Sequence, residues 1–216
     1  MKTTTIRRYS AAARALGEAI APKPVKPCGG CTLCCKVIPV GELGLPAFTR
    51  CQHERSFPMA GPAGCAIYAT RPSSCRVWSC QWALDGLPDD LRPDRCGVVI
   101  DPQPDIIRLV DDDTGDARTL AAVQMWAAPG FEDAFKRQPG LAMVLAAIDR
   151  YGCVVWRMRG ENGEQVAMSL FRHKGKLTCT GLAGVHAEFT ASMSEGERLL
   201  RAQQLIDRAD QRRGPR

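Results

Sequence analysis

The sequence predicts an α+β fold in which a loop-rich, cysteine-dense region packs on a small antiparallel sheet with helices. Three observations predict this class. Eight of the 11 cysteines lie between Cys28 and Cys80, in a stretch that is punctuated by glycines and has little regular periodicity. Short runs of strand-forming residues follow, and segments with helical periodicity lie among and beyond them. At 216 residues, the chain is long enough to bury a core without disulfide support.

Changes in composition divide the chain into four regions. Residues 1–27 are a basic tail and a Pro-rich linker, in which a short helix over residues 6–20 is one interpretation. Residues 28–95 are the cysteine-cluster region. Residues 96–192 are an α+β body, and residues 193–216 are a C-terminal helix with a basic tail.

The strands of the body are predicted from five short runs of residues: Val98–Ile100, Ile106–Val110, Ala121–Trp126, Cys153–Met158 and Gln165–Phe171. The last two runs flank Gly160–Gly163, a segment whose Asn-Gly pair is typical of a tight turn. These two runs therefore predict a β-hairpin.

Helices are predicted around these strands. Leu141–Arg150 carries one apolar stripe at helical spacing, which indicates a helix that packs on a sheet, and a shorter helical piece over Phe131–Arg137 precedes it. Ser194 and Glu197 have the spacing of a capping box. They predict a polar C-terminal helix over about residues 194–211.

Positive charge is concentrated at the two ends of the chain. The formal net charge is +6, but residues 1–27 hold six cationic side chains against one acidic side chain, and residues 212–216 add three arginines. The remainder is mildly acidic, which argues against a nucleic-acid partner for the body. No apolar run is long enough for a membrane helix and no secretory signal is visible, so we expect a cytoplasmic protein without a membrane partner.

Clustered cysteines in a reducing cytoplasm are more often metal ligands than disulfide partners. The first element reads Cys28-Gly-Gly-Cys31-Thr-Leu-Cys34-Cys35. Two residues between cysteines allow a tight turn that directs both sulfurs at one metal, and glycine suits that turn because it accepts positive φ. Four further cysteines follow downstream: Cys51, Cys65, Cys75 and Cys80.

The adjacent cysteines Cys34 and Cys35 limit how the ligands are shared. Adjacent side chains diverge, so these two thiols more naturally serve two neighbouring centres, or one binds a metal while the other packs beneath it. Eight thiolates fit two tetrahedral zinc sites, a four-iron cluster with a zinc site, or a merged binuclear site. His53 is interpreted as a surface residue rather than a ligand.

The last two cysteines of the cluster are predicted to lie on one helix. Pro72 suits the first turn of a helix that carries Cys75 through Trp82. Cys75 and Cys80 would then lie about 140° apart round the helix axis, so they do not face one way. Either the first turn is distorted, or these two cysteines serve different centres.

The region begins with the motif C-x2-C-x2-C-C and continues from Gly64 with G-C-x-I-Y-x-x-R-P-x-x-C-R and a last cysteine. This pattern resembles the YkgJ-type CxxCxxCC cysteine-cluster family. The resemblance covers about residues 28–82. That family is described as zinc- or iron-chelating, and a related cluster occurs in flagellin lysine methylases. The resemblance implies zinc or iron as the cofactor, with an iron–sulfur cluster as one form. The implied ligands are Cys28, Cys31, Cys34, Cys35, Cys51, Cys65, Cys75 and Cys80.

Two functions are consistent with this pattern. The first is a metal-binding protein that coordinates zinc or iron through eight cysteines in a structural or metal-handling role. The alternative is an iron–sulfur redox protein, or an accessory to a modifying enzyme. No catalytic motif lies outside the cluster, so the sequence assigns no catalytic residue and leaves enzymatic activity open. Cys96, Cys153 and Cys179 are predicted to pack as small buried residues.

Overall fold

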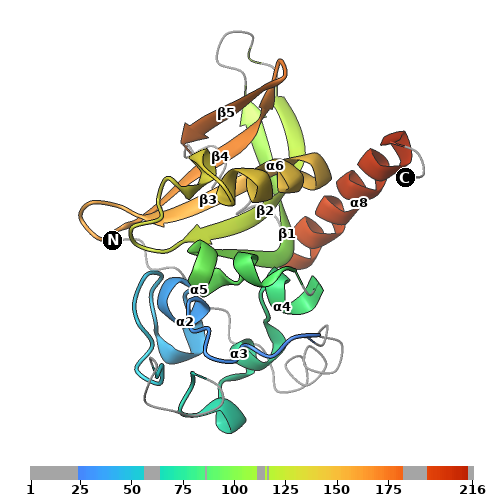
Figure 1. The fold of residues 1–216 in the computed structure, drawn as a ribbon. Coiled ribbons are helices and arrows are strands. Elements are labelled where there is room, and N and C mark those ends of the chain that lie inside the picture. The colour runs from blue at the N-terminus through green and yellow to red at the C-terminus, as the bar shows by residue number, and fades with distance from the viewer. Residues whose placement is uncertain are drawn as a thin grey trace. The chain divides into compact units, whose positions relative to one another are not determined.

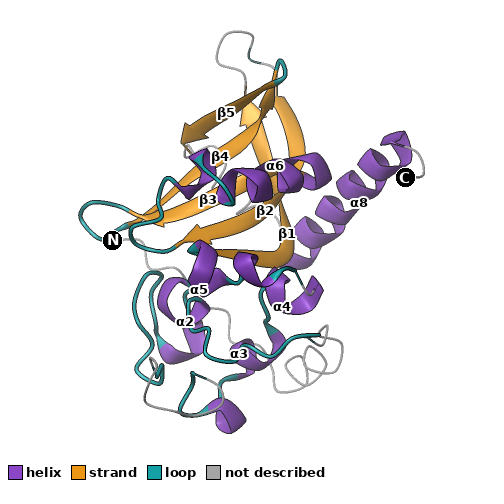
Figure 2. Ribbon diagram, viewed as in Figure 1, coloured by secondary structure: helices purple, strands orange, loops and turns teal. Residues whose placement is uncertain are grey.

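A computed structural model of the chain describes residues 24–55, 64–85, 87–110, 115, 117–181 and 194–213. The helix suggested for residues 6–20 lies outside the described residues. The chain divides into two compact units, one over Met1–Arg95 and the other over Cys96–Arg216. Helices occur in both units, and the second unit holds a five-stranded sheet (Figures 1 and 2). The α+β class is therefore confirmed.

The described helices of the first unit are all very short. They are α2 (Cys34–Val37), η1 (Gly41–Leu43), η2 (Tyr68–Thr70), α3 (Ser73–Val77), α4 (Gln81–Asp85), η3 (Asp89–Leu91) and α5 (Pro93–Cys96), the last of which reaches one residue into the second unit. Helices of this length are not stable by themselves in water. The fold of this unit therefore depends on contacts between its segments or on a ligand.

The sheet of the second unit follows the order of the chain. Its strands are β1 (Val98–Val110), β2 (Ala117–Ala127), β3 (Gly152–Arg159), β4 (Gln165–His173) and β5 (Lys176–Gly181). Neighbouring strands pair antiparallel, except that β2 and β3 are parallel. The prediction of a purely antiparallel sheet is therefore wrong. The reason is the connection between these two strands, because α6 (Gly140–Tyr151) returns the chain to the end of the sheet where β2 begins.

The strands extend further than the sequence patterns indicate. β1 joins two runs that are predicted as separate strands, and its pairing with β2 changes register between Ile100 and Pro104. Proline has no N–H group for the ladder, which accounts for an irregularity at this point. The hairpin of β3 and β4 is confirmed, and Gly163 in its turn has a φ of 84°. β5 is not among the predicted strands.

Both helices predicted for the second unit are present, with one change. The segment before α6 is a single 3-10 turn, η4 (Ala134–Lys136), rather than a helix over Phe131–Arg137. α8 (Glu195–Arg213) starts with the predicted capping box, in which Glu197 N–H donates to Ser194 Oγ at 3.2 Å and Ser194 N–H donates to the Glu197 carboxylate at 2.7 Å. Of the described helices, none combines the length and apolar content that a membrane span requires.

The core of the second unit lies on both faces of the sheet. α6 and α8 contact one another and cover the same face (Figure 1). There Ile106 and Ala121 form a buried cluster with Ala202 and Ile206 of α8. A second buried cluster lies on the opposite face and consists of Ile107, Ala122, Cys153, Val155 and Phe171. Burial of these apolar side chains is the main source of stability for the unit.

Gly140, the first residue of α6, leaves no room for a side chain. A Cβ there would lie 2.3 Å from the carbonyl oxygen of Ala134, a backbone atom that cannot move without disturbing η4. We expect Gly140→Ala to lower the free energy of unfolding by about 1–3 kcal/mol, measured by urea denaturation. Gly181→Ala is the control, because a Cβ at the end of β5 meets no described atom within 4 Å. Equal destabilisation by both changes would contradict this prediction.

Candidate metal centre

All eight cysteines predicted as ligands lie in the described part of the first unit, and all are free thiols. Cys31 and Cys80 are buried, and the other six are partly exposed. Half of them lie within residues 28–35, and the other half come from segments further along the chain. The geometry of these segments decides which thiols approach one another.

The turn that carries the first two cysteines is tight. Cys31 N–H donates to the carbonyl oxygen of Cys28 at 3.0 Å. Gly29 within this turn has a φ of 55°, which residues with a side chain rarely adopt. Cys34 and Cys35 follow at the start of α2, where their Sγ atoms lie 4.0 Å apart. Four thiols are therefore held on one turn and one short helix.

Cys75 and Cys80 do not share a helix. α3 ends at Val77, and Trp78 is extended (φ −93°, ψ 134°) before α4 begins. The prediction of one helix from Cys75 through Trp82 is therefore wrong. Because the helix is interrupted between them, the two cysteines are not related by the geometry of a single helix.

Cys80 directly precedes α4. The N–H groups of Ala83 and Trp82 are directed at its sulfur, and Ala83 N–H also donates to the carbonyl oxygen of Cys80 at 3.0 Å. Burial raises the pKa of Cys80, and the hydrogen bond from Ala83 N–H opposes that shift. The new helix thus begins where its first amides meet this thiol.

Cys31 has a similar environment. The N–H groups of Leu33 and Asp94 donate to its sulfur. Arg92 holds the Asp94 carboxylate through two bonds of 2.6 and 2.8 Å. Burial nevertheless raises the pKa of Cys31 to about 12, because desolvation disfavours the thiolate. Amides that point at sulfur favour the thiolate and are a usual feature around metal-bound cysteines.

The adjacent thiols on α2 have opposite pKa shifts. The hydrogen bond between the two thiols raises the pKa of Cys34 and lowers the pKa of Cys35. The positive charges of Lys36 and Arg71 also favour the Cys35 thiolate, whereas burial and the carboxylate of Glu54 oppose it. Cys35 therefore ionises more readily than its neighbour.

Cys51 and Cys65 are attached to α2 through the backbone. Cys51 N–H donates to the carbonyl oxygen of Cys35 at 2.9 Å. Glu54, three residues further on, forms an isolated β-bridge with Cys65. These contacts connect three cysteines that are widely separated in the sequence.

Glu54 is a buried carboxylate that holds this arrangement in place. It accepts a hydrogen bond from Thr32 Oγ1 at 2.8 Å, lies 3.5 Å from Lys36 Nζ and pairs with Arg50. A buried charge is tolerated when it is paired in this way. No pattern in the sequence marks Glu54, because a single glutamate beside a histidine is not a recognisable motif.

Arg71 supplies positive charge to the thiols. Its guanidinium lies 3.9 Å from the ring centre of Tyr68. Its charge favours the thiolates of both Cys28 and Cys35. Its Nε is buried and makes no hydrogen bond with the described residues. The loop therefore holds a cation against the thiols, which suits a site that carries negative charge.

The thiols do not form a finished coordination shell. Among the described residues, no group of three or more Cys, His, Asp or Glu side chains is placed to hold a metal ion. The donor type nevertheless fits zinc or iron, because thiolates supported by N–H donors suit both. A change of rotamer moves a cysteine sulfur by about 3 Å. Binding would therefore require several side chains to reorient.

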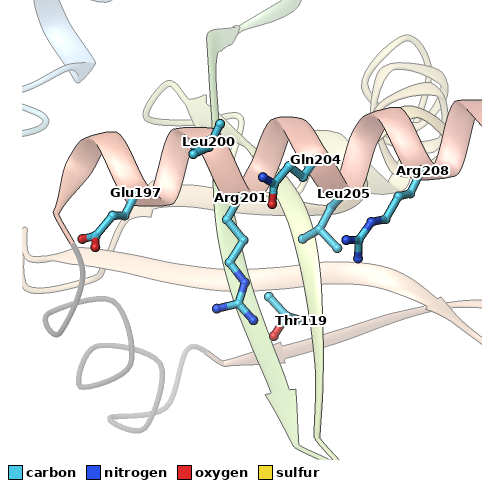
Figure 3. Close-up of a pocket in the computed structure, with 7 residues that line it drawn as sticks. All are labelled: Thr119, Glu197, Leu200, Arg201, Gln204, Leu205 and Arg208. Atoms are coloured by element: carbon cyan, nitrogen blue, oxygen red, sulfur yellow. The ribbon is translucent and has the colours of Figure 1, made fainter.

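A groove in the second unit is the other candidate site. It has a volume of about 440 Å³ and lies between α8 and β2 (Figure 3). Its polar lining consists of Glu197, Arg201, Gln204 and Arg208 from α8 and Thr119 from β2. This lining includes no thiol or imidazole, so the groove lacks the ligands that zinc and iron prefer.

The three cysteines outside the cluster belong to the second unit. Cys96 and Cys153 are 4% and 0% exposed, so the prediction that they are buried is confirmed. The same prediction is wrong for Cys179, which is exposed. The reason is that β5 is an edge strand on which nearly every side chain is exposed.

The opposite pKa shifts of Cys34 and Cys35 predict unequal thiol reactivity. In metal-free protein at pH 7.5, we expect iodoacetamide to label Cys35 faster than Cys34 or Cys31 by about tenfold or more, because the thiolate is the reactive form. Peptide mass spectrometry measures the three rates, with Cys179 as the exposed reference thiol. Labelling of Cys31 should keep rising with pH after labelling of Cys35 has levelled off. Equal rates at all three positions would contradict the opposite pKa shifts of Cys34 and Cys35.

Comparison of the chain with protein-family models, with curated proteins and with solved structures finds no match. The resemblance to the YkgJ-type family therefore rests on the cysteine motif alone and stays a prediction.

Proposed function

We propose that the first unit is a metal-binding module in which the eight cysteines coordinate zinc or iron in a structural or metal-handling role. The observation that carries this proposal is the gathering of the thiols. Each of the eight interacts electrostatically with at least one other, although they come from separate segments of the chain. Free thiols gathered in this way are typical of a metal site before the metal is bound.

The local charges support the same proposal. Eight thiolates around two divalent ions would carry a net charge of about −4. Arg71 and Lys36 face this charge, since both favour the Cys35 thiolate. Backbone N–H groups directed at Cys31 and Cys80 stabilise the ionised sulfur further.

The short elements of the unit give the metal a structural role. Helices of three to five residues contribute little stability of their own. Metal binding to several segments at once would supply folding free energy to them. The packing of this region on the sheet, which the sequence predicts, stays a prediction.

The alternative is an iron–sulfur protein that transfers electrons or assists a modifying enzyme. Four thiolates can hold a four-iron cluster, and N–H donors to sulfur tune the reduction potential of such clusters. The amides at Cys31 and Cys80 suit this role as well as they suit zinc. The metal itself therefore has to be identified by experiment.

Purification without oxygen, followed by analysis of the metal content, distinguishes these functions. We expect a colourless protein with about two zinc ions per chain and no acid-labile sulfide. A brown protein with labile sulfide would favour the iron–sulfur alternative. A folded protein that retains neither metal, and takes up neither after reduction of its thiols, would overturn both.

Replacement of single cysteines tests the boundary of the ligand set. We expect Cys34→Ser to lower the metal content per chain, because it removes a proposed ligand on α2. Cys153→Ser is the control and should leave the metal content unchanged, since Cys153 is buried in the sheet of the second unit. Elemental analysis of the two purified variants measures the difference. Equal metal loss in both would show that the ligand boundary is wrong.

Removal of the Arg71 charge should make zinc binding more sensitive to pH. Zinc binds the thiolate, and the cation opposes the burial that raises the pKa of Cys28. We expect Arg71→Gln to weaken zinc binding at pH 7 by about tenfold. The loss of zinc affinity should be smaller at pH 9, because more of the Cys28 thiol is ionised there even without the positive charge of Arg71. Competition with a chelator measures the affinity at each pH.

Arg55→Gln is the matched control for this change. It removes the same charge from an exposed position in the same unit. A similar loss of zinc affinity in both variants would mean that net charge, rather than the placement of Arg71, controls binding.

A further inference from the structure

We propose that the eight cysteines form two separate four-sulfur metal sites rather than one merged cluster. The first site consists of Cys28, Cys31, Cys34 and Cys80. The second site consists of Cys35, Cys51, Cys65 and Cys75. The two sites meet at the adjacent pair on α2. This inference rests on the proposed function, because it assigns the ligands within the same metal-binding unit.

Backbone contacts bring the segments of the first site together. Val25 N–H and Lys26 N–H both donate to the carbonyl oxygen of Ala83, at 2.9 and 3.1 Å. The chain just before Cys28 therefore runs beside the start of α4. Cys80 lies at that start, with Ala83 N–H directed at its sulfur. The turn that begins at Cys28 and the start of α4 are thus neighbours.

The thiols of the first site interact with one another through space. The charges of Cys31 and Cys80 interact, and so do those of Cys80 and Cys28. Cys34 interacts with both Cys28 and Cys31. Each member therefore interacts with at least two others of the same set.

A different set of contacts assembles the second site. Cys51 N–H donates to the carbonyl oxygen of Cys35, and the bridge between Glu54 and Cys65 adds the third cysteine. The charge of Cys75 interacts with those of Cys35, Cys51 and Cys65. Cys75 therefore approaches the three cysteines that the backbone has already connected.

The position of α3 explains why Cys75 belongs to the second site. The Glu42 carboxylate accepts hydrogen bonds from Ser73 N–H at 3.2 Å and from Ser74 N–H at 2.9 Å. This contact fastens the first turn of α3 to η1, the element that follows α2 along the chain. The extended residue Trp78 then separates α3 from α4. Cys75 and Cys80 are thereby directed to different sets.

The two sets adjoin at Cys35. Its sulfur lies 4.0 Å from that of Cys34, and its charge also interacts with that of Cys28. Arg71 favours the thiolates of both Cys28 and Cys35, so its charge acts on one member of each set. Four thiolates around one divalent ion carry a net charge of about −2, and a cation shared by two such sites reduces their repulsion.

Four double variants test this division, and they combine the same four cysteines in pairs in two different ways. Two double variants place both changes in one site: Cys31→Ser with Cys80→Ser, and Cys65→Ser with Cys75→Ser. Two other double variants place one change in each site: Cys31→Ser with Cys65→Ser, and Cys75→Ser with Cys80→Ser. Every full-length variant is reduced, reconstituted with Zn²⁺ and equilibrated with a competing chelator. Native mass spectrometry then counts the zinc ions per chain.

We expect two zinc ions in the unaltered protein, one in each same-site variant and none in either cross-site variant. A same-site variant that keeps one ion also shows that its other site is folded. Equal zinc loss in all four variants would overturn the division and indicate a merged cluster. Absence of zinc from the unaltered protein would overturn the proposed function itself, which separates the two failures.

Discussion

Desolvation of the cysteine thiols is the constraint on which the first unit depends. Burial raises the pKa of Cys28, Cys31, Cys75 and Cys80, so these groups are held in their protonated form. Backbone amides and the charge of Arg71 oppose this effect without cancelling it. A thiophilic cation that displaces these protons would neutralise the thiolates that burial otherwise disfavours. The proposed metal would therefore relate the burial of the thiols, the nearby positive charges and the short helices to one another.

The second unit rests on a different physical basis. Its sheet buries apolar side chains on both faces, and Trp156 is fully buried while its indole N–H donates to the carbonyl oxygen of Glu132 at 2.9 Å. Long strands and two helices of 12 and 19 residues satisfy their own backbone groups. Its stability therefore has a source that does not involve the cysteine cluster. Any dependence of the protein's stability on metal should therefore be confined to the cysteine-rich unit.

Local signals in the sequence predict local structure well. The capping box at Ser194, the Asn-Gly turn that contains Gly163 and the apolar stripe of α6 each involve residues close together in the chain. The errors concern features that depend on distant residues. Three features depend on contacts between secondary-structure elements: the parallel pairing of β2 with β3, the exposure of Cys179 on the edge strand and the break at Trp78. The periodicity of apolar residues and their secondary-structure propensities contain no information about such contacts.

The sequence by itself determined the chemistry of the candidate site: the number of thiols, their spacing in the first turn and the short, glycine-rich character of the segments that carry them. Only the tertiary structure decided which thiols approach one another. The segments of Cys28 and Cys80 become neighbours through the carbonyl oxygen of Ala83, and those of Cys35 and Cys65 are connected through Cys51 and Glu54. The physical reason is that backbone hydrogen bonds and a buried ion pair join segments tens of residues apart. Their partners are chosen by the packing of the whole unit, which no local stretch of the chain specifies.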